Sequence, residues 1–239
     1  MYVINFFGAP GAGKSTAALG LTYQLKRHWV DAEYVPEFAK DLVWRETAHL
    51  LKHQLFVFAE QQLRIDCLKG KVDVVVSDSP LLLSAFYAPE DYPLPFKMSV
   101  FEFFDTYKNI NIVVRRSNKY VARGRLQDEL ESDRLADLME QFLFETGVPY
   151  YVIHANDANP MHLTRWLIQQ GVIDPPNKKL LEENQDPLPE GWIEPVLKQQ
   201  LGSNGLPKRN VAAIARHYLD KGIRTVGDHP ASVLETNAG

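Results

Sequence analysis

The residues best suited to chemistry form a glycine-rich segment near the start of the chain. Gly8, Gly13, Lys14 and Ser15 meet the spacing G-x-x-x-x-G-K-S, with a hydrophobic run before them and a helical pattern after them. Glycines let backbone N–H groups turn toward phosphate oxygens, the lysine reaches the β- and γ-phosphates, and the serine hydroxyl can ligate Mg²⁺. We therefore predict a loop that binds ATP with Mg²⁺. Its contact residues are Gly8, Ala9, Pro10, Gly11, Ala12, Gly13, Lys14, Ser15 and Thr16.

Two carboxylates are predicted to lie beside this loop. Asp78 directly follows the β-branched run at 72–77, and Glu37 comes just after the strand-like segment at 32–35. Ligands of parallel α/β sheets bind at the carboxyl ends of the strands, where both side chains would meet. We expect Asp78 to share the metal with Ser15, and Glu37 to orient or deprotonate an acceptor. The alternatives are a helix cap for Asp78 and an exposed turn for Glu37.

A basic segment follows the fourth strand-like run, 111–114. Its cations are Arg115, Arg116, Lys119, Arg123 and Arg125, and no acidic residue interrupts them. Arginine can bind phosphate through two parallel N–H groups, so such a segment can form a lid over a triphosphate. We predict Arg123 and Arg125 as catalytic cations and Arg116 as a substrate contact. A solvated basic loop and a nucleic-acid contact are the alternatives.

A helical pattern at 54–69 offers contacts for the acceptor. Gln61 and Arg64 share one face of it at i, i+3 spacing. We predict that both line the pocket for the acceptor. A solvated helix face is the alternative.

The surroundings of the loop distinguish three classes of P-loop protein. A GTPase carries Asn-Lys-x-Asp, and the nearest string, 118–121, lacks the aspartate. A motor ATPase ends its acidic strand with Asp-Glu, whereas Ser79 and Pro80 follow Asp78 here. A kinase needs a metal anchor, an acid near the acceptor and mobile cations, and candidates for all three are present. The sequence therefore favours a kinase.

Strand-like runs alternate with helical patterns along most of the chain. The expected strands are 2–7, 32–35, 72–77, 111–114 and 149–153, and the expected helices are 14–28, 39–51, 54–69, 97–107, 129–146 and 160–169. Such alternation is typical of right-handed βαβ units and of a parallel sheet covered on both faces. We predict an α/β three-layer sandwich.

The composition fits one domain with an appendage. A chain of 239 residues, 45% of them hydrophobic, can bury a sizeable core, and its net charge of -4 gives no bulk attraction to nucleic acid or to an anionic membrane. We place a boundary near 173, between a domain at 1–173 and an extension at 174–239. The extension contains one expected helix, 209–219, and could be a docked tail, a homodimerisation arm or a small helical module.

The chain shows neither a secretory signal nor an apolar stretch long enough to span a bilayer, which favours a cytoplasmic location. Cys67 is the single cysteine, so an intrachain disulfide is excluded, and we expect it to be buried.

These motifs resemble the P-loop nucleoside and nucleotide kinases. The resemblance is strongest to the AAA-type ATPase/kinase family that includes the nicotinamide riboside kinase domain of bacterial NAD regulators and stand-alone phage proteins. Segments 8–16, 35–40, 77–80 and 123–127 carry it, and it covers about residues 1–170. It implies a five-stranded parallel sheet of order 2-3-1-4-5 and phosphoryl transfer from ATP.

The resemblance also assigns roles by position. Glu37, Asp78, Arg123 and Arg125 would serve phosphoryl transfer to a small acceptor, namely a nucleoside, a nucleoside monophosphate or a molecule like nicotinamide riboside. Two other functions stay open: a kinase for a hydroxylated base in phage DNA, and a non-catalytic ATP-dependent switch. DNA is not favoured as a partner, because the charges of the extension nearly cancel.

Overall fold

The computed structural model describes residues 1–117, 120, 128–155, 159–177, 187–196 and 211–220. Its strands are β1 (Tyr2–Phe7), β2 (Ala32–Val35), β3 (Val74–Ser77), β4 (Lys108–Arg115), β5 (Tyr151–His154) and β6 (Glu194–Pro195). They form one sheet of order β2-β3-β1-β4-β5-β6, parallel except for β6, which runs antiparallel to β5. The predicted α/β class and the order of the five parallel strands are confirmed. The sixth strand was not predicted.

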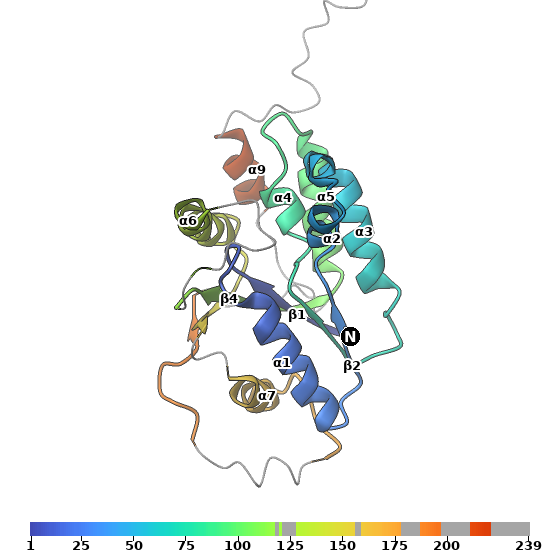
Figure 1. Ribbon diagram of the computed structural model, residues 1–239, viewed down its shortest axis with the longest axis vertical. Helices are drawn as coiled ribbons and strands as arrows, with labels where there is room; N and C mark the ends of the chain where they lie inside the picture. Colours follow the sequence, from blue (N-terminus) through green and yellow to red (C-terminus); the bar gives the residue numbers. More distant parts are fainter. Residues whose placement is uncertain (118–119, 121–127, 156–158, 178–186, 197–210, 221–239) are drawn as a thin grey trace, which may run out of the picture.

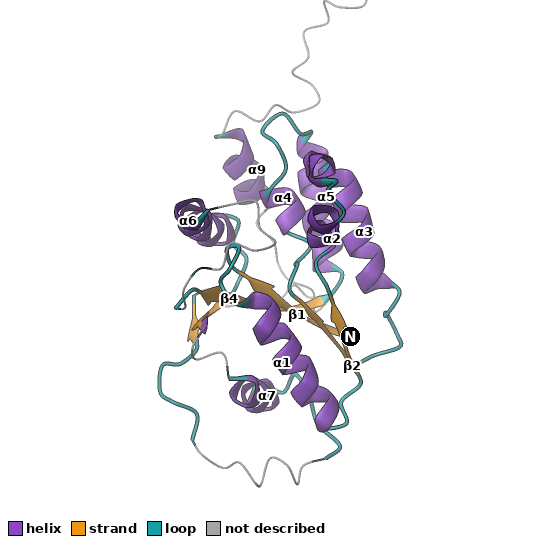
Figure 2. Ribbon diagram, in the orientation of Figure 1, coloured by secondary structure: helices purple, strands orange, loops and turns teal. Residues whose placement is uncertain are grey.

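Helices cover both faces of this sheet (Figures 1 and 2). They are α1 (Lys14–Arg27), α2 (Phe38–Trp44), the 3₁₀ helix η1 (Ala48–Lys52), α3 (Gln54–Asp66), α4 (Leu83–Phe86), α5 (Leu94–Asp105), α6 (Glu129–Glu145), α7 (Pro160–Gln169) and α9 (Val211–Leu219). Helices α1 and α7 lie on one side of the sheet, and the others lie on the opposite side (Figure 1). The three-layer sandwich is therefore as expected.

Strand β1 shows how the sequence builds these layers. Its alternate side chains point to opposite faces, because side chains in a strand have a period of two. Ile4 and Phe6 join the core under α1 and α7, whereas Val3 and Phe7 join the core under α3 to α6 and α9. All four side chains are buried, as expected for a central parallel strand.

Two local predictions are wrong. The expected helix at 39–51 is broken into α2 and η1, because Glu46 adopts a left-handed conformation with φ 60° that no helix can continue through. Cys67 is exposed rather than buried, since it lies just beyond the end of α3. None of the helices in the described ranges has the length and apolar character needed to cross a membrane.

The described parts of the C-terminal extension pack against the rest of the protein. Ile214 and Tyr218 of α9 are buried, and the Tyr218 hydroxyl donates to the carbonyl oxygen of Ala85 at 3.3 Å. His217 Nδ1 lies 2.6 Å from Glu145 Oε2 at the end of α6. Strand β6 extends the sheet at the edge of β5. Whether the extension is a docked tail, a homodimerisation arm or a small helical module stays a prediction.

Candidate nucleotide and acceptor site

The glycine-rich loop is shaped by its own backbone. Gly8, Gly11 and Gly13 have φ angles of 140°, 87° and 97°, which other residues rarely adopt. A Cβ atom on Gly8 would lie 2.6 Å from the carbonyl oxygen of Val114 in β4. Helix α1 begins at Lys14 directly after this loop and has no acidic residue in its first turn. The loop therefore presents backbone N–H groups and the positive end of a helix dipole to an anion.

Lys14 lies over the loop that precedes it. Its Nζ atom donates to the carbonyl oxygens of Gly8 at 2.7 Å and Ala9 at 3.1 Å. The ammonium group is thus held beside the position where the loop N–H groups would bind phosphate, as expected for the P-loop lysine.

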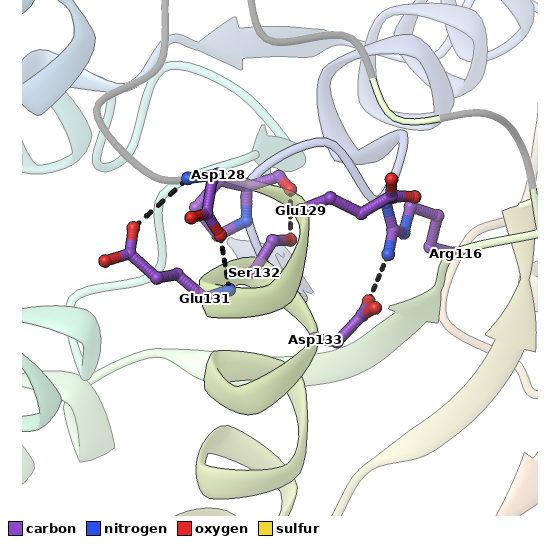
Figure 3. Close-up of polar contacts among 7 residues, drawn as sticks. Arg116, Asp128, Glu129, Glu131, Ser132 and Asp133 are labelled. Atoms are coloured by element: carbon purple, nitrogen blue, oxygen red, sulfur yellow. Dashed lines mark hydrogen bonds and ion pairs between the residues drawn. The ribbon is translucent and has the colours of Figure 1, made fainter.

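Side chains of helix α6 contact the same loop, and Figure 3 shows the start of this helix. Asp128 and Glu131 form a capping box that starts the helix, because each side chain accepts from the other residue's backbone N–H. One turn on, the Ser132 hydroxyl donates to the carbonyl oxygen of Pro10 at 2.6 Å. The Gly8 N–H group donates to Met139 Sδ at 3.3 Å. Two side chains of α6 therefore fix the loop from a segment more than a hundred residues away.

A pocket of about 250 Å³ opens between the loop, the end of β4 and α6. Its lining residues are Ala9, Ala12, Val114, Arg115, Arg116, Ser132, Asp133, Ala136, Asp137 and Glu140. Arg115 binds Glu140 through two contacts of 2.8 and 2.6 Å. Arg116 binds Glu129 at 2.8 Å and also Asp133 (Figure 3). The two arginines that begin the basic segment are therefore neutralised by carboxylates of α6 in this state.

Asp78 lies at the carboxyl end of β3, as predicted, and only 2% of it is exposed. Its Oδ2 atom accepts a hydrogen bond of 2.8 Å from the Tyr34 hydroxyl of β2. Its Oδ1 atom is buried and has no hydrogen-bond partner within the described residues. Burial, the charge of Asp78 and the hydrogen bond to it raise the pKa of Tyr34. Tyr34 and Asp78 therefore meet on neighbouring strands, and Ser15 lies in the first turn of α1, directly after the phosphate-binding loop.

This arrangement fits a magnesium ion. An orphaned buried carboxylate oxygen calls for a cation or a water molecule, and Ser15 supplies a hydroxyl oxygen on the neighbouring helix. Mg²⁺ is commonly held by one or two protein oxygens together with substrate phosphates and water. The described residues contain no group of three or more His, Cys, Asp or Glu side chains that could hold a metal ion.

Glu37 follows β2 and occupies the position before the first residue of α2. Burial raises its pKa; the charge of Lys14 lowers it and that of Asp78 raises it further. The structure thus brings together Glu37, Lys14 and Asp78, three residues that the sequence analysis grouped.

Gln61 and Arg64 of α3 hold the segment that carries Glu37. The Gln61 side chain accepts from the Phe38 N–H group at 3.0 Å and donates to the Pro36 carbonyl oxygen at 3.3 Å. Arg64 donates to the same carbonyl oxygen at 3.4 Å and binds Asp41 at 2.6 Å. These polar contacts are to the protein itself, so both residues support the acceptor side by holding its backbone. Direct contact of either residue with an acceptor stays a prediction.

Other predicted site residues have different outcomes. Lys119, Arg123 and Arg125 lie outside the described residues, so their roles as lid cations stay predictions. Tyr34 and Ser132 were not predicted to belong to the site. Neither carries a motif, and only the pairing of β2 with β3 and the packing of α6 on the loop bring them there.

A family model described as an AAA domain matches residues 3–159, which span the sheet from β1 to β5 and every site residue named above. No curated protein matches the chain.

Proposed function

Because this chain belongs to the AAA domain family of P-loop proteins, we propose that it is an ATP-dependent kinase for a nucleoside or nucleotide. The observation that carries the proposal is the place of Glu37: it follows β2, whose last residue Val35 pairs with Ser77 of β3, so this carboxylate lies at the same edge of the sheet as Asp78. A hydrolytic motor would instead carry an acid directly after Asp78, where this chain has Ser79.

In the proposed reaction a hydroxyl oxygen of the acceptor attacks the γ-phosphorus of ATP. Glu37 accepts the hydroxyl proton, the new O–P bond forms, and the bond to the bridging oxygen of the leaving ADP breaks. Lys14 and the loop N–H groups bind the β- and γ-phosphates and stabilise the charge that moves onto ADP. The raised pKa of Glu37 makes it a stronger base than an ordinary carboxylate.

The chemistry of Glu37 favours a hydroxyl acceptor over a phosphate acceptor. A nucleoside hydroxyl must lose a proton when it attacks, and Glu37 can take it. The phosphate of a nucleoside monophosphate is already anionic, needs no base, and would be repelled by Glu37 and Asp78. Within the proposed class we therefore place nucleosides, including nicotinamide riboside, ahead of nucleoside monophosphates.

The remaining residues have supporting roles in this proposal. Bound Mg²⁺ would offset negative charge on the β- and γ-phosphates, held by Asp78 and Ser15. Arg116 would exchange its carboxylate partners on α6 for substrate phosphate, and Arg123 and Arg125 would close over it. Gln61 and Arg64 would shape the acceptor pocket through the segment that they hold.

A screen with γ-labelled ATP tests the proposal. The acceptors are nucleosides, nucleoside monophosphates, nicotinamide riboside and DNA containing hydroxylated bases, and the Lys14→Ala variant serves as the inactive control. We expect label on a small hydroxyl acceptor with wild type alone. Release of inorganic phosphate without any labelled acceptor would indicate a hydrolase. Tight ATP binding with neither product would indicate a switch protein.

A further inference from the structure

Tyr34 contacts Asp78, one of the two residues that are placed to hold the metal. It lies on β2 in register with Val76 of β3, so its side chain starts two residues before the level of Asp78. Its partly buried ring packs against the core under α1, and its hydroxyl donates to Asp78 Oδ2 at 2.8 Å.

We propose that Tyr34 is a positioning residue of the magnesium site: its hydroxyl holds Asp78 so that Oδ1 faces the metal. The inference rests on the proposed binding of ATP with Mg²⁺ and does not depend on the identity of the acceptor.

The two oxygens of Asp78 support this assignment because they differ. One accepts from Tyr34 and the other is buried without a hydrogen-bond partner in the described part of the chain. A phenol is protonated at neutral pH and donates one hydrogen, so it can satisfy one carboxylate oxygen and must leave the second for another ligand. This is the arrangement in which a neighbour fixes the orientation of a metal ligand without touching the metal.

Tyr34→Phe removes the hydroxyl and keeps the ring that packs on the core. Residues that orient metal ligands typically change metal affinity by about 10- to 100-fold when they are lost. We expect a loss of this size in the affinity of Mn²⁺ for the ADP complex. The affinity for ADP without metal should be unchanged, because the loop N–H groups and Lys14 are untouched.

The experiment titrates Mn²⁺ into the full-length protein with saturating ADP and follows free Mn²⁺ by electron paramagnetic resonance. Calorimetric titration of ADP in EDTA gives the metal-free affinity. Tyr2→Phe is the control, because Tyr2 packs on the same core from β1, and Asp78→Asn gives the effect of losing the carboxylate itself. Both controls are compared with wild type under the same conditions.

The outcomes separate the hypotheses. Weaker Mn²⁺ binding with unchanged metal-free ADP binding supports the positioning role. Equal Mn²⁺ affinity in Tyr34→Phe and wild type overturns it, and so does a parallel loss of metal-free ADP affinity, which would indicate a packing defect. No acceptor is present, so failure of the kinase proposal would leave this result intact.

Discussion

The two sides of the site are held in place in different ways. The phosphate-binding loop takes its shape from three glycines with positive φ angles, all within the segment 8–13. The segment 36–38, which carries Glu37, is instead held by Gln61 and Arg64 of α3, more than twenty residues further along the chain. The first side takes its backbone conformation from its own glycines and is braced by Ser132 and Met139 of α6, whereas the second depends on its tertiary contacts with α3.

The difference predicts how each side responds to change. A substitution on the nucleotide side should act through the backbone of the loop itself. On the acceptor side, a substitution in α3 should reach the site indirectly and leave nucleotide binding intact. Four measurements test this contrast.

The largest expected effect is on turnover in Glu37→Gln. The amide cannot accept the acceptor proton, so kcat should fall by about 10²- to 10⁴-fold, the usual contribution of a general base. ATP affinity by calorimetry should stay close to that of wild type. Glu33→Gln is the matched control, because Glu33 lies on β2, the strand that Glu37 follows, and pairs with Lys26 at the surface. Unchanged kcat in Glu37→Gln would remove this residue from the mechanism.

Gly8→Ala should damage the nucleotide side. The new methyl group would meet the Val114 carbonyl oxygen at 2.6 Å in a residue with φ 140°, and we expect a loss of about 1–3 kcal/mol in the free energy of unfolding. ATP affinity should fall as well, because the loop must shift. Gly70→Ala is the control that separates backbone strain from steric collision. Gly70 also has a positive φ, 73°, but an added Cβ atom would meet no other atom within 4 Å. Equal losses in both variants would show that the collision does not matter.

Gln61→Ala should damage the acceptor side alone. It leaves the Phe38 N–H group without its side-chain acceptor. A buried donor without an acceptor lowers the free energy of unfolding by about 1–3 kcal/mol. We expect a lower kcat and an unchanged ATP affinity, measured by steady-state kinetics and calorimetry. Gln62→Ala is the neighbouring control. A loss of ATP affinity in Gln61→Ala would contradict the independence of the two sides.

The last expected effect is a modest dependence of stability on pH. Burial raises the pKa of Glu37 above its ordinary value of 4.5, so the folded protein binds this proton more tightly than the unfolded chain. The contribution of this proton to the free energy of unfolding is fully present below pH 4.5 and is lost as the pH rises through the raised pKa. Glu37→Gln should therefore have a higher Tm than wild type at pH 8, and the difference should shrink toward pH 4.5. A lower Tm at pH 8 would argue against the shift.

The same contrast explains which site residues could be predicted from the sequence and which could not. The positions of Glu37 and Asp78 are predictable because each residue follows the end of a strand, and the carboxyl ends of parallel strands meet at one edge of the sheet. Tyr34 is not predictable, since its role depends on the pairing of β2 with β3 rather than on any motif. Ser132 likewise reaches Pro10 only because α6 packs over the loop.

The order of the parallel strands followed from the resemblance and is confirmed, whereas β6 was missed. A strand of two residues carries too little pattern to be recognised in a sequence. The break between α2 and η1 was missed for a related reason, because Glu46 is not a residue type that usually marks a left-handed conformation.

Helix α6 has a consequence for anyone who engineers this protein. Ser132 near its start rests on the phosphate-binding loop, and Glu145 at its end contacts α9. Thirteen residues at 1.5 Å each make the helix a rod of about 20 Å between the two contacts. A domain fused after α9 would be connected, through α9, to the end of α6 that lies away from the phosphate-binding loop. We therefore expect the extension to be a suitable place to attach a reporter of nucleotide binding.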